Sequence, residues 1–265
     1  MSIRGFRSDI SASALQSQFD RGIGSGHGKD YKPPITTENF DSLGHSGKYH
    51  CPVSERTVHY LSETEEGARY GALQDQEVTD LRENYPLATG LTELICKQFR
   101  LRHPRSTGED KPLIPFTVDL LVSRRTPPTR IVVLGKTRQA LKEPKNRKEA
   151  LVLHAYWSLF NTPIFWVTDL EFTKNILESL QFLRPQGHLA RSPLDKPEAQ
   201  RFLEAARQAD WTPPLLEVIR TIANQIGMDS TPAMEIYKEL VWSHALPCDY
   251  QLCIGPRTRN AVCWR

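Results

Sequence analysis

The stretch TVDLLVSRRTPPTRIVVLGK, from Thr117 to Lys136, reads as two apolar strands joined by a turn of arginine, threonine and proline residues. Asp119 lies near the start of the first strand among apolar side chains, where an ionised carboxylate is costly unless a cation or a hydrogen bond compensates it. Lys136 ends the second strand. A carboxylate and a lysine at adjacent strand ends, with another carboxylate from an upstream helix, are typical of metal-dependent nucleases. In these enzymes the carboxylates hold Mg²⁺, and the lysine positions or activates the attacking water.

The length of 265 residues predicts two domains. No run of about 18 apolar residues is present, so no membrane span is expected. The N-terminal sequence MSIRGFRSDISASALQ lacks the apolar core of a signal peptide. The five cysteines are odd in number, unevenly spaced and without a zinc-type pairing, so we expect reduced thiols in a cytoplasmic protein.

Charge is distributed unevenly along a chain whose net charge is only +3. Residues 97–148 hold 14 Lys and Arg against 4 Asp and Glu, whereas residues 55–83 hold 8 Asp and Glu against 3 Lys and Arg. A basic stretch next to an acidic one fits a polyanionic substrate held near carboxylates that bind metal. The alternative is that these charges simply cover a surface.

A glycine-rich segment, RGIGSGHGKDYKPP, occupies residues 21–34. It does not match a nucleotide-binding fingerprint, because those patterns need a preceding strand and a following helix. With His27, Lys29 and Tyr31 it could lie along a DNA backbone. The alternative reading is a flexible arm.

The upstream carboxylate is expected from SETEEGARYGALQD, at residues 62–75. Ser62 is a plausible N-cap, and Glu65 follows it at the spacing of a capping box. On spacing alone, capping is favoured over metal binding for Glu65. Of the neighbouring carboxylates Glu63 and Glu66, the second is expected to face elsewhere on the helix.

Helix, strand, strand, helix and strand follow one another up to residue 169, which predicts an α/β domain with a mixed sheet at residues 1–170. Residues 171–265 have a different pattern, with amphipathic helices followed by the short apolar segments YQLCI and NAVCW around a Gly-Pro-Arg turn. Three helices and a C-terminal hairpin with a basic turn are the interpretation of this pattern, and they predict a mostly helical winged-helix domain that binds a partner or DNA. A helical bundle with a β tail fits the same pattern.

Six segments occur in an order that resembles the TnsA family, the endonuclease subunits of heteromeric Tn-seven-like transposases. They are GHGKDY (26–31), RTVHYLSETE (56–65), VTDLRENYPL (78–87), TVDLLV (117–122), the strand ending in Lys136, and AYW to PIFWVTD (155–169). The resemblance spans essentially the first 170 residues and is weaker in the second part.

This resemblance implies a restriction-endonuclease-like catalytic domain that uses Mg²⁺, with Mn²⁺ able to substitute. The domain would hydrolyse the non-transferred strand at the 5′ ends of the element during cut-and-paste transposition. A DDE-type recombinase subunit (TnsB-like) would cut and join the 3′ ends. An AAA+ regulator (TnsC-like) would be the third partner, contacted through the C-terminal part. The implied location is the bacterial cytoplasm, in association with the nucleoid.

The resemblance also assigns the site. The family's helical glutamate falls on Glu65, its strand aspartate on Asp119 and its lysine on Lys136. The family has a glutamine as a further metal ligand two residues before the lysine, but this chain has Leu134, which cannot bind Mg²⁺. The backbone carbonyl of Gly135 is the expected third ligand. Glu149 or Gln139 reaching into the site is an alternative.

Basic residues are expected to follow the phosphate backbone without reading sequence. The first candidates are His27, Lys29, Arg124, Arg125 and Arg130.

Two other functions remain open from the sequence. One is an architectural subunit of the same transposase, catalytically inert because of Leu134, which bridges recombinase, regulator and DNA. The other is a winged-helix transcription regulator, which would bind its own operator and would not need Glu65 or Lys136.

Overall fold

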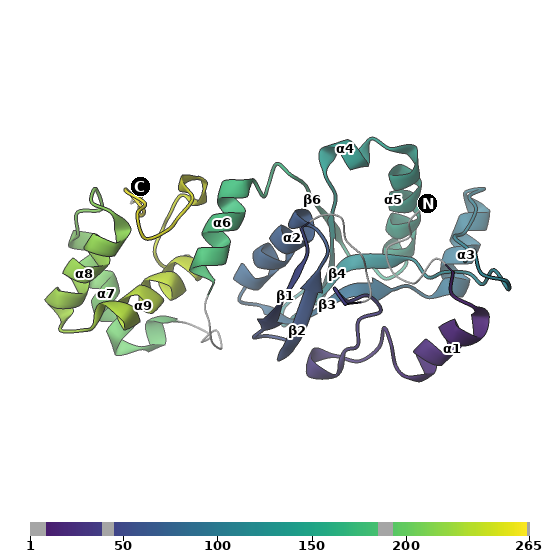
Figure 1. Ribbon diagram of the computed structural model, residues 1–265, viewed down its shortest axis with the longest axis horizontal. Coiled ribbons are helices and arrows are strands. Elements are labelled where there is room, and N and C mark those ends of the chain that lie inside the picture. The colour runs from purple at the N-terminus through teal and green to yellow at the C-terminus, as the bar shows by residue number, and fades with distance from the viewer. Residues whose placement is uncertain (1–8, 39–44, 185–192, 264–265) are drawn as a thin grey trace. The chain divides into compact units, whose positions relative to one another are not determined.

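The computed structural model describes residues 9–38, 45–184 and 193–263 (Figure 1). The chain divides into two compact units, Met1–Glu171 and Phe172–Arg265. All five cysteines are free thiols. Within the described ranges, no helix combines the length and the apolar character needed to cross a membrane.

A four-stranded mixed sheet forms the centre of the first unit. Its strands, in spatial order, are β3 (Val78–Pro86), β4 (Thr117–Arg124), β5 (Arg130–Gly135) and β6 (Ile164–Val167). The first three run antiparallel, and β6 runs parallel to β5. A parallel pair needs a long crossover, which α5 (Pro144–Ser158) supplies after the short α4 (Arg138–Leu141). The predicted mixed α/β architecture is confirmed, and it fits a restriction-endonuclease-like domain.

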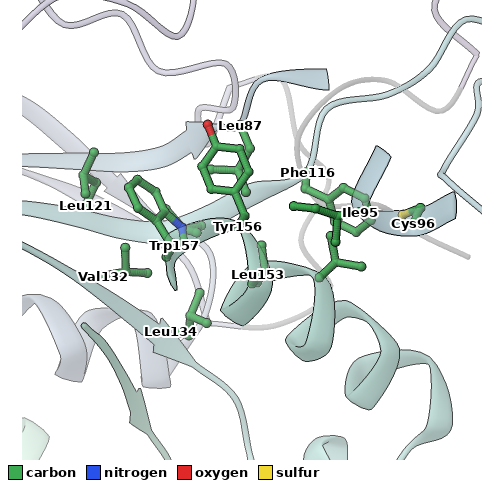
Figure 2. Packing of buried hydrophobic residues seen from close by; sticks show 12 residues of the cluster. Leu87, Ile95, Cys96, Phe116, Leu121, Val132, Leu134, Leu153, Tyr156 and Trp157 are labelled. Carbon is green, nitrogen blue, oxygen red and sulfur yellow. The ribbon is translucent and has the colours of Figure 1, made fainter. Parts of the chain in front are cut away.

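One side of the sheet packs in a continuous apolar core against α5 and α3 (Thr89–Gln98) (Figure 2). In α5 the buried side chains recur at the spacing of one helical stripe. Burying each large apolar side chain contributes about 1.5–3 kcal/mol. The core residues are Leu87, Ile95, Cys96, Phe116, Val118, Leu121, Val132, Leu134, Val152, Leu153, Tyr156 and Trp157.

Helix α2 (Glu63–Gln74) packs against β4, β5 and β6. The antiparallel pair β1 (Gly47–Cys51) and β2 (Arg56–Tyr60) forms a separate small sheet, in which β2 contacts both α2 and β3. As a result, nearly all of α2 is buried. Its first turn comes to lie against the end of β5, which brings the predicted carboxylate helix to the predicted strand ends.

Buried ion pairs account for much of the acidic stretch at residues 55–83. Glu83 is 1% exposed and accepts hydrogen bonds from both terminal nitrogens of Arg56, one of them at 2.8 Å. Its Oε1 atom also accepts from the backbone N–H of His59 at 3.2 Å. Glu65, Glu66 and Asp80 are buried as well. These four of the eight carboxylates in the stretch are therefore internal to the fold, and for them the alternative in which the charges simply cover a surface was wrong.

The glycine-rich segment is folded against β3, so the flexible-arm reading was wrong. It lies between α1 (Ala12–Asp20) and the 3-10 helix η1 (Gly28–Asp30). Gly26 has a φ of +95°, and a Cβ there would lie 2.5 Å from the carbonyl oxygen of Asp30. Tyr31 is buried, and its hydroxyl donates to the carbonyl of Glu83 at 2.9 Å. Burial raises the pKa of this hydroxyl, so it stays protonated and able to donate.

The second unit is helical. Its helices are α6 (Lys174–Leu183), η2 (Pro193–Asp195), α7 (Pro197–Gln208), α8 (Leu215–Ile226), α9 (Ser230–Trp242) and η3 (Tyr250–Leu252). The predicted helices of this region are present. Their amphipathic stripes form the core, with Phe202, Leu215, Ile219 and Tyr237 among the most buried side chains.

The predicted C-terminal hairpin was wrong, because residues 243–263 contain no strand. Backbone groups of this tail bond to the helices and form short turns, such as the bond from the N–H of Thr258 to the carbonyl of Gly255 at 3.0 Å, instead of pairing as two strands. Ser179 of α6 bridges the carbonyl of Tyr250 and the N–H of Ile254, at 2.7 Å each. The N–H groups of Leu215 and Leu216, at the start of α8, donate to tail carbonyls at 2.8 and 2.9 Å. The winged-helix arrangement is therefore not confirmed.

Candidate active site

Asp119 lies where β4 and β5 stop pairing. The ladder between them runs from Ser123 opposite Arg130 to Leu120 opposite Val133. One residue further on, the Oδ2 atom of Asp119 accepts the backbone N–H of Gly135 at 2.8 Å. The carboxylate thus takes the place that a backbone carbonyl of β4 would occupy if the ladder continued. The bond joins Asp119 to Gly135, and both residues were predicted from the sequence to belong to one metal site.

Gly135 also brings α2 to this point. A Cβ atom at Gly135 would lie 2.9–3.0 Å from the carbonyl group of Thr64 and the nitrogen of Glu65. Real Cβ atoms essentially never approach backbone this closely, so only glycine lets the first turn of α2 lie directly against the end of β5. The elements that carry Glu65, Asp119 and Gly135 therefore adjoin one another.

Glu65 forms the capping arrangement that its spacing predicted. Its backbone N–H donates to Oγ of Ser62 at 3.3 Å, and its Oε2 atom accepts the N–H of Leu61 at 2.9 Å. The side chain is buried, with the residue 5% exposed. An ionised carboxylate can accept about four hydrogen bonds or ligand contacts. Capping therefore orients Glu65 without excluding a metal at the same group.

Lys136 directly follows β5 and extends its pairing with β6, since its backbone N–H donates to the carbonyl of Val167 at 2.9 Å. Its side chain is 16% exposed, and its Nζ atom lies 3.7 Å from Oε2 of Glu149 on α5. Glu149, one of the two alternatives from the sequence, therefore reaches the lysine. Gln139, the other one, is exposed on α4.

Leu134 is a core residue and is only 2% exposed (Figure 2). It packs in the same cluster as Val132, Leu153 and Trp157, between the sheet and α5. The side chain that replaces the family's glutamine is thus part of the packing that holds α5. A third side-chain ligand from this position is absent, and the surrounding core is apolar.

The transposition protein TnsA of transposon Tn7 from Escherichia coli is 27% identical to this chain over 177 residues. The chain is TnsA-like. The matched segment covers 66% of this chain and 64% of that protein, which is less than two thirds of its length. No protein-family model matches the chain. The resemblance inferred from the sequence motifs is confirmed.

The donor groups of this TnsA-like chain suit a hard divalent cation. Glu65 and Asp119 offer carboxylate oxygens and Gly135 a carbonyl oxygen, which are ligands that Mg²⁺ and Mn²⁺ prefer. Within the described ranges, no group of three or more His, Cys, Asp or Glu side chains could hold a metal. A cation here would therefore rest on two carboxylates, with water completing its shell. Mg²⁺ usually keeps several waters, so this set fits it.

The predicted DNA-contacting residues of the TnsA-like chain are divided by the fold. His27 is exposed, with 78% of its side chain accessible, and Lys29 is exposed on η1. Arg124 donates from Nε to Asp75 at 2.8 Å, and Arg125 donates to the carbonyl of Gln76 at 2.9 Å. These two arginines hold the corner between α2 and β3.

The hairpin turn with its three arginines lies at the opposite end of β4 and β5 from Asp119. Five residues separate Asp119 from Arg124 along the strand, which corresponds to about 16 Å at the usual rise per residue. Arg130 is exposed at the same far end. Phosphate contact by these residues stays a prediction, and it would fall away from the scissile bond.

Leu134→Gln is expected to destabilise the TnsA-like unit without improving any metal site. The amide would enter an apolar core, and the combined loss of packing and burial of unpaired polar atoms costs about 3 kcal/mol. Urea unfolding of the full chain measures this loss. Leu134→Met is the matched control, because it conserves volume and should cost less than about 1.5 kcal/mol. A glutamine variant as stable as the parent would show that the position can turn toward the site.

Proposed function

We propose that the chain is the endonuclease subunit of a transposase, which hydrolyses the non-transferred strand at the 5′ ends of the element. The observation that carries the proposal is the junction of Asp119, Gly135 and the first turn of α2 at the end of β4 and β5. Similarity to TnsA supports it, since the matched protein is a transposition protein by name. DNA at the element ends is the proposed substrate.

The residues of the junction have separate tasks in this proposal. Asp119 and Glu65 hold the metal, and each is already oriented by a backbone N–H group. A bound Mg²⁺ lowers the pKa of its water and stabilises negative charge on the phosphate. Lys136, positioned by Glu149 at 3.7 Å, neutralises phosphate charge or orients the attacking water. The carbonyl of Gly135 and water would complete the ligands of the metal.

For the second unit we propose partner binding. The TnsB-like recombinase and the TnsC-like AAA+ regulator are the proposed partners, and the resemblance to TnsA is what supports them. Recognition of a specific DNA sequence by a β wing is not part of the proposal, because residues 243–263 contain no strand.

The test is strand-specific cleavage of a duplex that carries a transposon end. The full chain is combined with the recombinase subunit, with Mg²⁺ or with EDTA, and each strand is labelled separately. We expect cuts on the non-transferred strand only when metal and partner are both present. An architectural subunit would leave that strand intact in the complete complex. A transcription regulator would bind one operator alone and would give no metal-dependent cut.

A further inference from the structure

A group of exposed cations follows Lys136 directly in the chain and is here called the α4–α5 surface. Its members are Arg138, Lys142, Lys145, Arg147 and Lys148. Glu143 is the one acidic residue between positions 138 and 148. This surface was not among the DNA contacts predicted from the sequence, which were placed on the glycine-rich segment and the β4–β5 turn.

The α4–α5 surface is tied to the candidate active site at two points. Lys136 is followed at once by α4, and the contact between Lys136 and Glu149 brings the second turn of α5 to the same place. Lys145 precedes Glu149 by four residues and so lies on the same helix face, one pitch of about 5.4 Å away. Lys148 and Arg147 lie about 100° and 200° around the helix from Glu149, on its flank and outer face. The two helices are also fastened together, since Asn146 donates from its side chain to the carbonyl of Ala140 at 2.6 Å.

Three of these cations have no carboxylate partner in the described structure, although Arg147 donates from Nε to the carbonyl of Leu141 at 3.4 Å. Within the residues that the structure describes, Lys142, Arg147 and Lys148 take part in no ion pair, and all three are exposed. Arg138 and Lys145 differ, because Arg138 pairs with Asp169 at 3.3 Å and Lys145 pairs with Glu143 at 3.0 Å. The backbone N–H of Arg138 holds the pKa of Asp169 below its ordinary value, so that carboxylate stays ionised and offsets the arginine.

The position of the cations on α5 also argues against a role in helix stability. The first turn of α5 carries basic residues and no acidic residue. Positive charge near a helix N-terminus is unfavourable in the field of the helix dipole. By contrast, Arg124 and Arg125 at the β4–β5 turn make hydrogen bonds that hold a corner of the fold.

We propose that the α4–α5 surface, through Lys142, Arg147 and Lys148, contacts the phosphates of the DNA that flanks the candidate active site. The proposal rests on the proposed function, which supplies DNA as the substrate, and it names the face of the unit that DNA meets. Lysine and arginine on an exposed face bind phosphates without reading bases, so the contact is independent of sequence.

The experiment compares two sets of three substitutions in the full chain. One is Lys142→Gln, Arg147→Gln and Lys148→Gln on the α4–α5 surface. The matched control is Arg100→Gln, Arg102→Gln and Lys111→Gln, which removes the same charge from exposed positions of the first unit that were not predicted to contact DNA. Fluorescence anisotropy measures affinity for a transposon-end duplex and for an unrelated duplex, over a range of salt concentrations and in EDTA.

We expect the α4–α5 set to lower affinity for both duplexes by at least about 10-fold at 0.1 M salt. The slope of log affinity against log salt should also fall by about 2–3, since each lost phosphate contact contributes roughly 0.9. The control set should change affinity by less than about 3-fold. Equal effects of the two sets, or a parent chain that binds neither duplex at low salt, would overturn the proposal.

Binding in EDTA needs no cleavage, which keeps the two proposals apart. A parent chain that binds DNA through the α4–α5 surface but never cuts would refute the nuclease function and leave the surface standing. Thermal unfolding of both triple variants checks that neither has lost its fold, as expected for exposed positions.

Discussion

Asp119→Asn is expected to lower 5′-end cleavage by about 100- to 1,000-fold, the range seen when one electrostatic group of an active site is removed. Asparagine keeps the shape of the side chain, and its carbonyl oxygen can still accept the N–H of Gly135, which Asp119 accepts at 2.8 Å. The variant therefore loses the negative charge that would hold a metal while retaining the strand-end contact. Strand-specific cleavage with the recombinase subunit and Mg²⁺ measures the effect.

Asp75→Asn is the matched control for this substitution. Asp75 is a carboxylate of the same unit that pairs with Arg124 at 2.8 Å, at the far end of β4 from Asp119. Its loss should leave cleavage within about 2-fold, since this partly exposed ion pair lies at the far end of β4 from Asp119 and surface pairs contribute about 1 kcal/mol or less to stability. Co-purification with the recombinase checks assembly for both variants. Parent-level cleavage by the Asp119→Asn protein would remove Asp119 from the site.

Glu83→Gln should lower the free energy of unfolding of the first unit by about 3–5 kcal/mol. Glu83 and its partner Arg56 are 1% and 9% exposed, and removal of the carboxylate leaves a guanidinium buried without a counter-charge. The same guanidinium donates to the carbonyls of Gly28 and Leu81. Its displacement would therefore loosen the glycine-rich segment as well as β3.

Hydrogen exchange of the β3 amides measures this loss, because it reports on the first unit alone. Lys97→Gln is the control, since it breaks an exposed i,i+4 pair with Glu93 that is worth about 0.3–0.5 kcal/mol. The double substitution Arg56→Met and Glu83→Leu should recover much of the stability, because apolar replacement of a buried pair is often neutral. A single Glu83→Gln variant that loses less than about 1 kcal/mol would contradict this account.

The central sheet and the meeting of its strand ends could be predicted, because both follow from local signals. Apolar alternation bounded by turn residues defined β4 and β5, and Ser62 with Glu65 marked the start of α2. Once β4 and β5 are paired, Asp119 and Gly135 must fall at the same end. Sequence reasoning needed no tertiary information for these elements.

Other features depended on partners distant in the chain. Arg56 and Glu83 are 27 residues apart, and nothing in either local pattern shows that they pair. The glycine-rich segment has the composition of a linker, yet Tyr31 and Gly28 attach it to that pair. In the C-terminal tail the short apolar segments suggested strands, but hydrogen bonds to helices satisfied the backbone instead.

Leu134 shows a limit of transferring a site from relatives. By the resemblance to the TnsA family, Leu134 stands where a metal ligand was expected, which suggested a weakened metal site. In the fold it completes an apolar cluster with Val132 and Leu153. Whether a residue lies in a core or faces a site depends on which side of the strand it occupies, and a single-chain comparison does not give that.

The hydrogen bond from Gly135 to Asp119 also affects how a cation would be captured. A surface aspartate samples several rotamers, and freezing them costs entropy at the moment of association. Here one carboxylate oxygen is already fastened to the backbone, so the ordering occurs while the chain folds. If the proposed cation binds here, its capture would need little further ordering of Asp119. A site with so few protein ligands would then load and empty quickly.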